Sequence, residues 1–319
     1  MNYIKAVLLI GLSFLLAACE STETKILKVG ISPWPGYEPL ALAAQMGFYD
    51  DTKVRIIRFA TPTESYRALR DGIIDVAAFT ADEVFHYAGV REKPRIFLVL
   101  DISNGADAIV ARPDIKSLSD LKGKRIGLEG SALGDYMINR ALDFTQGVKI
   151  SDMKLIPIKI NLQTQAYLIN EVDAVVTYEP SKSMLINAGA HIIFDSSQIP
   201  AEVVDVLVTN EITVQTRPQE LTALATGWFK VVAHINDNYE QCMQNMSLNE
   251  ATNTQEFQRG YEDLIIPSKE QNLKMLGHNG SLLEPMQKLS KLMFSKGSLT
   301  NEIDVRPLLT NTILERMEE

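Results

Sequence analysis

Short apolar runs alternate with amphipathic stretches along most of this chain, and each run has the length of a β-strand. Such runs occupy residues 28–31, 75–79, 125–128 and 173–178, and each is followed by a helix signal. Strands that are apolar throughout are typical of parallel sheets covered by helices on both faces. The pattern therefore predicts an α/β fold.

The alternation occurs twice, which indicates two similar halves. Gly30 and Gly127 each lie in a short strand led by a basic residue, and Asp75 and Asp173 follow them by 45 and 46 positions. Each Asp opens a further apolar strand, and we expect both to have structural roles. The shared order and spacing favour two lobes built on one plan.

Capping residues place helix starts directly after strands. Residues 61–64 and 80–83 form capping boxes, and further helices are expected to begin near Ser131 and Pro180. In an open parallel sheet, ligands bind beyond the carboxyl ends of the strands, where helix N-termini present free N–H groups. Two facing lobes of this kind would form a cleft lined by such loops.

Two extended segments, 105–110 and 203–208, are expected to cross between the lobes. After Arg217-Pro218 the pattern is helical to the end, and we expect these helices to pack on the first lobe. We therefore predict a discontinuous first lobe of residues 26–106 and 206–319, and a second lobe of residues 107–205. Two such crossover segments would allow hinge closure around a ligand in the cleft.

The N-terminus has the pattern of a lipoprotein signal. Lys5 precedes an apolar stretch over residues 6–16, and Leu16-Ala17-Ala18-Cys19 has the form of a lipobox. The stretch is short for a membrane span and has small residues before its Cys. We predict a signal peptide over 1–18, lipid on Cys19 and a tether over 19–25. An uncleaved helix with an incidental Cys is the alternative.

Composition limits the partners. The net charge is −9 without a basic stripe, which argues against nucleic acid as a partner. With Cys19 assigned to lipid, Cys242 has no second cysteine to pair with, so no disulfide is expected. Hydrophobic residues make up 46% of the chain, enough for a sizeable core, and we expect a monomer.

An ordered set of motifs resembles one protein family. The segment Pro33-Trp34-Pro35-Gly36-Tyr37-Glu38-Pro39-Leu40 resembles the start of solute-binding proteins for nitrate, sulfonates, taurine and thiamine-pyrimidine precursors. Residues 70–77, 105–110, 118–126 and 172–175 continue the likeness in order, so that it covers roughly residues 26–265. The resemblance implies a type II periplasmic-binding-protein fold. It also implies a protein that delivers a small solute to an ABC importer in the cell envelope.

Two departures from the family bear on chemistry. The eukaryotic relatives that make the thiamine pyrimidine use a cysteine cluster and histidine chemistry, which this chain lacks. The candidate loops are also acidic, and Lys and Arg are scarce in them. A helix N-terminus can hold an anion unaided. The acids nevertheless shift the expectation towards a neutral, zwitterionic or amine-bearing ligand. They are Glu38, Asp82, Asp107, Glu129, Asp135 and Glu179.

Aromatic residues are the first ligand-binding candidates. Trp34 and Tyr37, with Gly36 in the stiff turn between them, can form a wall that stacks on a planar ligand, or can simply be buried beneath the loop. Tyr178 would face Trp34 from the second lobe and can stack as well. Tyr136 completes the aromatic candidates.

Polar candidates each have a structural alternative. Thr80 and Ser131 are expected as helix caps whose neighbouring N–H groups face the cleft. Asp107 can bind a ligand amine or tie up backbone at the hinge. Glu179 can accept a hydrogen bond from a ring amine, or can be a solvated residue favoured by the helix dipole. Glu38 and Asp82 join them as ligand-binding candidates.

Catalytic and cofactor signals are weak. Residues 129–133 lack the G-x-S-x-G spacing of a nucleophile elbow, and no glycine-rich phosphate loop occurs. The four histidines are scattered without metal-ligand spacing. We therefore predict no cofactor, no metal and no enzymatic activity.

Three functions are kept open, in this order. The first is a transport receptor that closes on a solute and docks on an ABC permease. The second is a sensor that signals the same closure to a membrane kinase or cyclase. The third is an enzyme on this fold that acts on a pyrimidine-like compound. In each case the protein is expected to be lipid-anchored and to face the periplasm. Glu20 slightly favours the outer membrane over the inner one.

Overall fold

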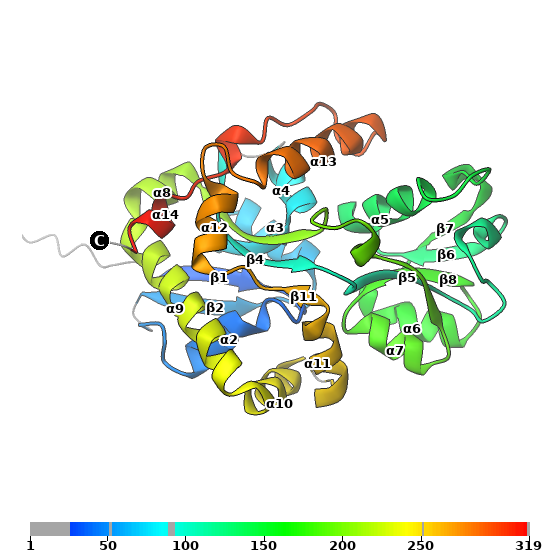
Figure 1. Cartoon of the computed structure of the whole chain (residues 1–319), viewed down its shortest axis with the longest axis horizontal. Helices are drawn as coiled ribbons and strands as arrows, with labels where there is room; N and C mark the ends of the chain where they lie inside the picture. Colours follow the sequence, from blue (N-terminus) through cyan, green and yellow to red (C-terminus); the bar gives the residue numbers. More distant parts are fainter. Residues whose placement is uncertain (1–25, 51–52, 89–92, 251, 318–319) are drawn as a thin grey trace, which may run out of the picture.

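The computed structural model describes residues 26–50, 53–88, 93–250 and 252–317. The predicted signal peptide, the tether up to residue 25 and Cys19 lie outside these ranges. The described chain forms two α/β lobes side by side, each built on one mixed sheet (Figure 1). Within the described ranges, no helix combines the length and the hydropathy that a membrane span requires.

The larger lobe contains a six-stranded sheet in the order β11-β4-β10-β3-β1-β2. β1 pairs in parallel with β2 and β3, whereas β10 runs antiparallel to β3 and β4. The strands are β1 (Leu27–Ile31), β2 (Val54–Arg58), β3 (Val76–Thr80), β4 (Pro94–Ser103), β10 (Val204–Asn210) and β11 (Leu264–Ile265).

The smaller lobe contains a five-stranded sheet in the order β7-β6-β8-β5-β9. β6 pairs in parallel with β7 and β8, and β5 runs antiparallel to β8 and β9. The two sheets therefore share one plan, in which one strand, β10 in the larger sheet and β5 in the smaller, is antiparallel to the strands on both sides of it. The strands are β5 (Asp107–Ala111), β6 (Arg125–Leu128), β7 (Lys154–Pro157), β8 (Ala174–Tyr178) and β9 (His191–Asp195).

The predicted repeat has a structural counterpart in one pair of hydrogen bonds. Oδ2 of Asp75 accepts from the backbone N–H of Lys28 at 2.8 Å, and Oδ2 of Asp173 accepts from that of Arg125 at 2.8 Å. The first bond ties the start of β3 to the start of β1, and the second ties the start of β8 to the start of β6. The structural roles predicted for both Asp residues are confirmed.

Helices cover both faces of the sheets, and their starts follow the predicted caps. Thr61 and Ser131 each accept a hydrogen bond from the helix that they cap, and Thr80 immediately precedes another helix. The helices are α2 (Glu38–Gln45), α3 (Pro62–Arg70), α4 (Ala81–Ala88), α5 (Ala132–Leu142), α6 (Ile160–Leu168), α7 (Ser181–Asn187), α8 (Glu211–Thr216), α9 (Pro218–Asp237), α10 (Tyr239–Asn249), α11 (Thr254–Glu262), α12 (Lys269–Leu276), α13 (Leu283–Ser295) and α14 (Thr312–Glu315).

The chain passes between the lobes through short links after β4 and β9. The predicted crossover segments 105–110 and 203–208 mostly form the strands that these links enter, β5 and β10. The predicted second lobe ends at Asp205. This residue instead lies within β10 of the six-stranded sheet, where it is paired with Thr80 and Asp101.

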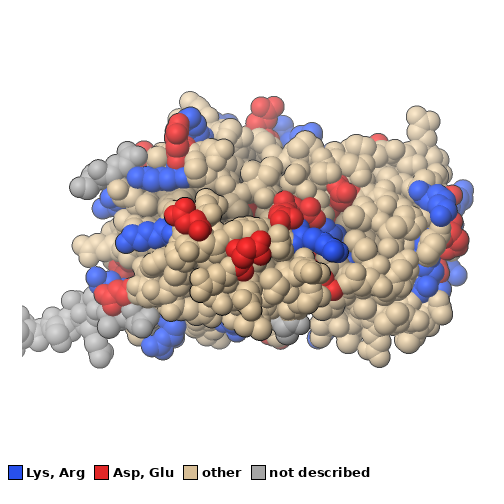
Figure 2. All heavy atoms as spheres, turned by 60° about the horizontal axis from the view of Figure 1, so that its bottom comes forward, with Lys and Arg blue, Asp and Glu red and all other residues tan. Residues whose placement is uncertain are grey.

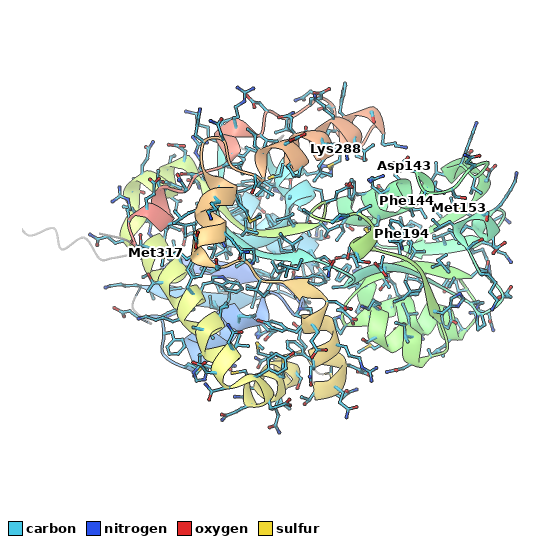
Figure 3. All side chains as sticks on the ribbon, in the orientation of Figure 1. Asp143, Phe144, Met153, Phe194, Lys288 and Met317 are labelled. Carbon is cyan, nitrogen blue, oxygen red and sulfur yellow. The ribbon has the colours of Figure 1, made fainter. Side chains whose placement is uncertain are left out.

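The C-terminal helices pack mainly on the larger lobe, as the pattern after Arg217 predicts. α9 contacts α2 and β2, and it buries Trp228 completely. In the smaller lobe, Phe144 after α5 lies against Phe194 of β9 with ring centroids 5.4 Å apart (Figure 3). Each lobe thus has apolar packing around its own sheet.

Charged side chains of both signs are interspersed on the face drawn in Figure 2, and the basic groups on this face do not form a continuous stripe. A nucleic-acid surface needs such a stripe to neutralise phosphates. This face of the molecule therefore does not have the charge pattern of a nucleic-acid interface.

Candidate ligand-binding cleft

A narrow cavity with an interior of about 30 Å³ lies between the two lobes, far below the roughly 300–1,000 Å³ typical of ligand pockets. The loop after β1, the end of β3 and the start of α4 form one wall, together with β10. The loop after β6, the end of β8 and the start of β5 form the other. The cavity is lined by Ser32, Pro33, Trp34, Tyr37, Pro62, Thr80, Glu83, Asp107, Glu129, Ser131, Leu133, Tyr178 and Asp205.

More than half of the predicted site residues lie in this wall. They come from strand ends and helix starts of both lobes, as expected where parallel strands end. They are Trp34, Tyr37, Thr80, Asp107, Ser131 and Tyr178.

Two predicted residues near the first strand have structural positions behind the wall. Glu38 is fully buried and forms a bidentate ion pair with Arg58, with N–O distances of 2.5 and 2.6 Å. Gly36 lies beneath Trp34, where an added Cβ would be 1.9 Å from Oδ2 of Asp101. Gly36 therefore permits the close approach of the loop to β4, and Glu38 anchors α2 to β2.

Three further predicted residues also lie outside the wall. Tyr136 donates its hydroxyl proton to Glu202, which fixes α5 to the second interlobe link. Glu179 is buried against Lys182 and Ser183. Asp82, in the first turn of α4, is 3% exposed, and burial raises the pKa of its carboxyl. None of these three lines the cavity.

Sequence reasoning did not select three acidic residues of the wall. Glu83 is the last residue of the predicted capping box after β3, and the sequence pattern indicated only this capping role. Glu129 stood among the acidic loop residues, directly after β6. Asp205 lies in the predicted crossover segment 203–208, where no local signal marks it as a site residue. The side chain of Asp205 lines the cavity because β10 pairs with β3, whose last residue also lines it.

Three aromatic rings meet at the cavity. Trp34 lies edge to face with Tyr178 at a centroid distance of 6.0 Å and with Tyr37 at 6.4 Å. The Trp34 indole donates its N–H to Oδ2 of Asp101 at 3.2 Å, and the Tyr178 hydroxyl donates to Oε2 of Glu129 at 3.1 Å. Each ring therefore combines an apolar contact face with a fixed polar edge.

The electrostatic character of the wall is acidic. Its titratable carboxyls are Glu83, Asp107, Glu129 and Asp205, and neither Lys nor Arg is among the lining residues. Burial raises the pKa of Glu83 to about 8 and that of Asp107 to about 7, because it penalises the charged form. A bound cation would reverse this effect by stabilising the carboxylates.

Asp107 keeps an acceptor free inside this wall. It is 1% exposed, and its backbone N–H donates to Oγ of Ser103 at 3.2 Å. Its Oδ2 has no hydrogen-bond partner within the described chain. A buried carboxylate oxygen without a donor is costly, and a ligand N–H group would satisfy it.

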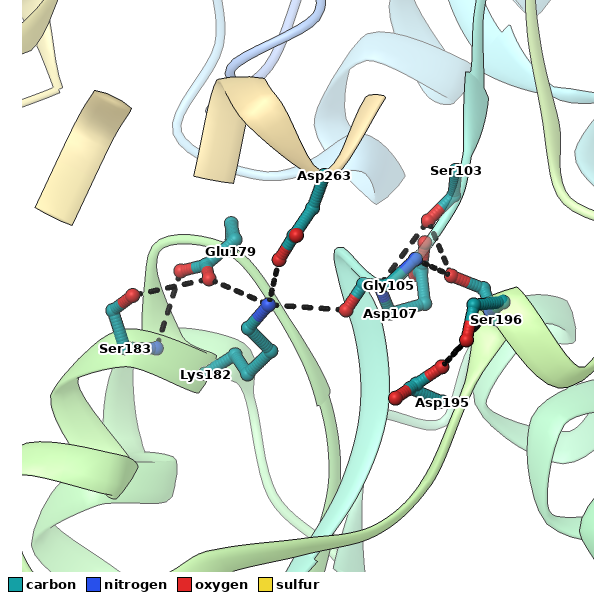
Figure 4. Close-up of polar contacts among 10 residues, drawn as sticks. Ser103, Gly105, Asp107, Glu179, Lys182, Ser183, Asp195, Ser196 and Asp263 are labelled. Atoms are coloured by element: carbon teal, nitrogen blue, oxygen red, sulfur yellow. Dashed lines mark hydrogen bonds and ion pairs between the residues drawn. The ribbon is translucent and has the colours of Figure 1, made fainter. Parts of the chain in front are cut away.

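A hydrogen-bonded network joins the lobes beside the cavity (Figure 4). Lys182 of α7 contacts Asp263 at 2.5 Å, Glu179 at 3.0 Å and the carbonyl oxygen of Gly105 at 3.0 Å. The hydroxyls of Ser103 and Ser196 are 2.8 Å apart and connect the two interlobe links. The ammonium group thus bridges the smaller lobe, the larger lobe and one link.

The described residues do not form a metal site. Across the described ranges, no three His, Cys, Asp or Glu residues are grouped so that they could hold an ion. Cys242 is buried in α10 and unpaired, and it is not among the cavity residues. The chemistry at the cavity is that of carboxyls, hydroxyls and aromatic rings.

Two known sequences match part of this chain. A Brucella abortus protein provisionally named a binding protein is 23% identical over 175 residues, covering 54% of this chain and 53% of the relative. A Haemophilus influenzae protein provisionally assigned to thiamine biosynthesis is 25% identical over 217 residues, covering 65% and 68%. This chain thus spans about half the length of the first relative.

Solved structures share the fold. The alkanesulfonate-binding protein SsuA of Xanthomonas axonopodis pv. citri, bound to MOPS, matches with a TM-score of 0.75 and 13% identity over 91% of this chain and 99% of SsuA. The desulfurization enzyme DSZB matches with a TM-score of 0.69 and 17% identity over 92% and 99%. The predicted two-lobe fold of periplasmic solute-binding proteins is confirmed.

The family assignment rests on most of the chain. The sequence model of the NMT1-like family matches residues 20–245, which include every residue of the cavity wall. The chain belongs to the NMT1-like family.

Proposed function

We propose that this protein is a solute-binding lipoprotein of the cell envelope that captures a small amine-bearing molecule between its lobes and delivers it to an ABC importer. Lipid on Cys19 would hold it at a membrane surface facing the periplasm, and the mature protein would act as a monomer. Family membership and the shared fold of import-system binding proteins support the transport role.

One observation carries the ligand class. Oδ2 of Asp107 is buried in the cavity wall without a donor, and neither Lys nor Arg lines the cavity. An anionic ligand would meet carboxyls at this point, whereas an ammonium or ring amine would donate to them. The site therefore differs chemically from one made for a sulfonate or nitrate, and a planar ligand would contact the rings of Trp34 and Tyr178.

The other two functions make different demands. A sensor would use the same cleft, so the two functions differ in their partners. Genes for a permease and an ATPase beside this gene would favour transport over sensing. An enzyme would convert its ligand, and DSZB shows that this fold can support catalysis. We favour a binding protein because the solved structures that share the fold include binding components of import systems.

The test is a thermal-shift screen of the full-length protein in detergent. Primary amines and aminopyrimidines are expected to raise the melting temperature, and sulfonates and nitrate to leave it unchanged. Asp107→Asn should abolish the shift. Asp135→Asn should keep it, because Asp135 is exposed on α5 and does not line the cavity. Stabilisation by sulfonates alone would contradict the proposed ligand class.

A further inference from the structure

Two aspartates lie directly opposite one another beneath the cavity. Asp101 of β4 and Asp205 of β10 are register partners in the antiparallel ladder. Their side chains are 0% and 1% exposed. Directly opposed residues have Cβ atoms about 4.5–5.5 Å apart, and like charges at that separation destabilise a sheet. Ionising both carboxyls at once therefore costs stability unless a cation lies close to them.

Each carboxyl has one oxygen bound by an aromatic residue. The Tyr37 hydroxyl donates to Oδ1 of Asp205, and the Trp34 indole N–H donates to Oδ2 of Asp101. No other described group donates to Oδ1 of Asp101 or to Oδ2 of Asp205. One proton shared between the two carboxyls would satisfy these oxygens.

The surroundings favour that proton. Besides Tyr37, the groups that face the pair are Glu83 of α4, Asp107 of β5 and Tyr261 of α11, which are all acids or phenols. Burial raises the pKa of Asp101 to about 7 and that of Asp205 well above its usual range. The pair therefore behaves as one coupled acid whose last proton is lost near or above neutral pH.

We propose that the Asp101–Asp205 pair is a proton-exchange subsite for a ligand ammonium group. Asp205 lines the cavity, so a positively charged donor can reach it there. In the empty protein one proton sits between the two carboxyls. When an ammonium group donates to Oδ2 of Asp205, that proton leaves to solvent, so that one positive charge replaces another and no other bond changes.

This exchange deepens the proposed function, since it assumes an amine-bearing ligand. Below the pKa of the pair, binding one ammonium ion releases up to one proton. Affinity should then rise by up to about tenfold per pH unit between pH 6 and 7 and level off above the pKa of the pair. A neutral ligand would bind without proton release.

The first experiment needs no ligand. The chain contains two tryptophans, and Trp228→Phe leaves Trp34 as the sole indole reporter, bonded to Asp101. The fluorescence of Trp34 in the full-length protein should titrate between pH 5 and 9. Asp101→Asn and Asp205→Asn should each remove that transition, and Asp135→Asn should retain it. A flat profile in the Trp228→Phe parent would overturn the shared proton.

The second experiment counts protons with benzylamine as a planar primary amine and benzyl alcohol as its uncharged counterpart. Calorimetry at pH 6.5 in two buffers of different ionisation enthalpy should show up to one proton released per benzylamine bound, and none with Asp205→Asn. Benzylamine binding without release would overturn the subsite and leave the proposed function intact. If benzylamine fails to bind at millimolar concentration, the amine function is contradicted, while the Trp34 titration still decides the shared proton.

Discussion

The indole of Trp34 and the phenol of Tyr178 touch edge to face across the cleft, with ring planes at 72° and centroids 6.0 Å apart. Trp34 follows β1 of the larger lobe, and Tyr178 ends β8 of the smaller one. Contact between them means that the lobes approach closely at the cavity mouth. A planar ligand that parts the two rings can lie flat against one of them and meet the edge of the other.

Replacing either ring by alanine should therefore weaken binding of a planar amine. We expect Trp34→Ala and Tyr178→Ala each to cost about 1–3 kcal/mol of binding free energy if the ring contacts the ligand. Calorimetry with benzylamine measures this effect. Tyr178→Phe is the matched control, since it keeps the ring and loses only the bond to Glu129. Unchanged affinity in both alanine variants, with folding intact, would remove the aromatic contact from the account.

A substitution at Gly36 tests how closely the loop after β1 approaches Asp101. A Cβ at this position would be 1.9 Å from Oδ2 of Asp101 and 2.7 Å from Nε1 of Trp34. We expect Gly36→Ala to reduce the free energy of unfolding by about 1–3 kcal/mol, because the loop must shift. Gly130→Ala, in the loop after β6, meets open space and should change the free energy of unfolding little. If the two variants lose the same free energy of unfolding in urea, the close approach of the loop to Asp101 is contradicted.

The pH dependence of stability should be the reverse of that of amine binding. Burial raises the pKa of Asp101 and Asp107 to about 7, of Glu83 to about 8 and of Glu250 to about 9, against values of about 4 in the unfolded chain. A carboxyl whose pKa is higher in the folded state than in the unfolded state contributes stability that is fully present below the pKa of the unfolded state. This stability is lost as the pH rises through the pKa of the folded state.

The empty protein should therefore lose stability progressively between pH 5 and 9, by up to about 1.4 kcal/mol per pH unit for each group that titrates. Calorimetric melting at several pH values measures the trend, and Asp101→Asn should make it shallower while the other three carboxyls retain their share. A melting temperature that increases towards pH 9 would show that these carboxyls are ionised in the folded state.

Lys182 provides a test of the contact between the lobes. Its ammonium group is buried between Glu179 and Asp263. Removing one partner of a buried ion pair leaves an uncompensated charge, so Lys182→Met should cost about 3–5 kcal/mol or open the lobes. Lys288→Met is the control, because its contact with Glu202 is 3.8 Å long and its side chain is 73% exposed. Small-angle scattering and urea unfolding that do not distinguish the two variants would refute this role.

Sequence reasoning located the elements that local chemistry defines. Strands with continuous apolar runs, such as β3 and β6, were predicted within one residue of their observed bounds, and helix caps such as Thr61 and Ser131 were identified because their signals are local. β2 is half exposed and β11 has two residues, so neither has an apolar run that stands out.

Side-chain direction was the harder part of the site. Glu38 and Asp107 are both acids next to strand or loop ends, yet one pairs with Arg58 behind the wall and the other lines the cavity. Asp101 and Asp205 become neighbours only through the pairing of β4 with β10, two strands more than a hundred residues apart in the sequence. Long-range pairing of this kind leaves no local pattern.

The central claim is that the cleft holds an amine-bearing small molecule. Native mass spectrometry of the full-length protein, purified in detergent, tests it most directly, with the released compound identified after denaturation. We expect a bound molecule that carries a protonatable amine and is lost in Asp107→Asn but kept in Asp135→Asn. A released sulfonate or other anion that binds equally well in Asp107→Asn would contradict it.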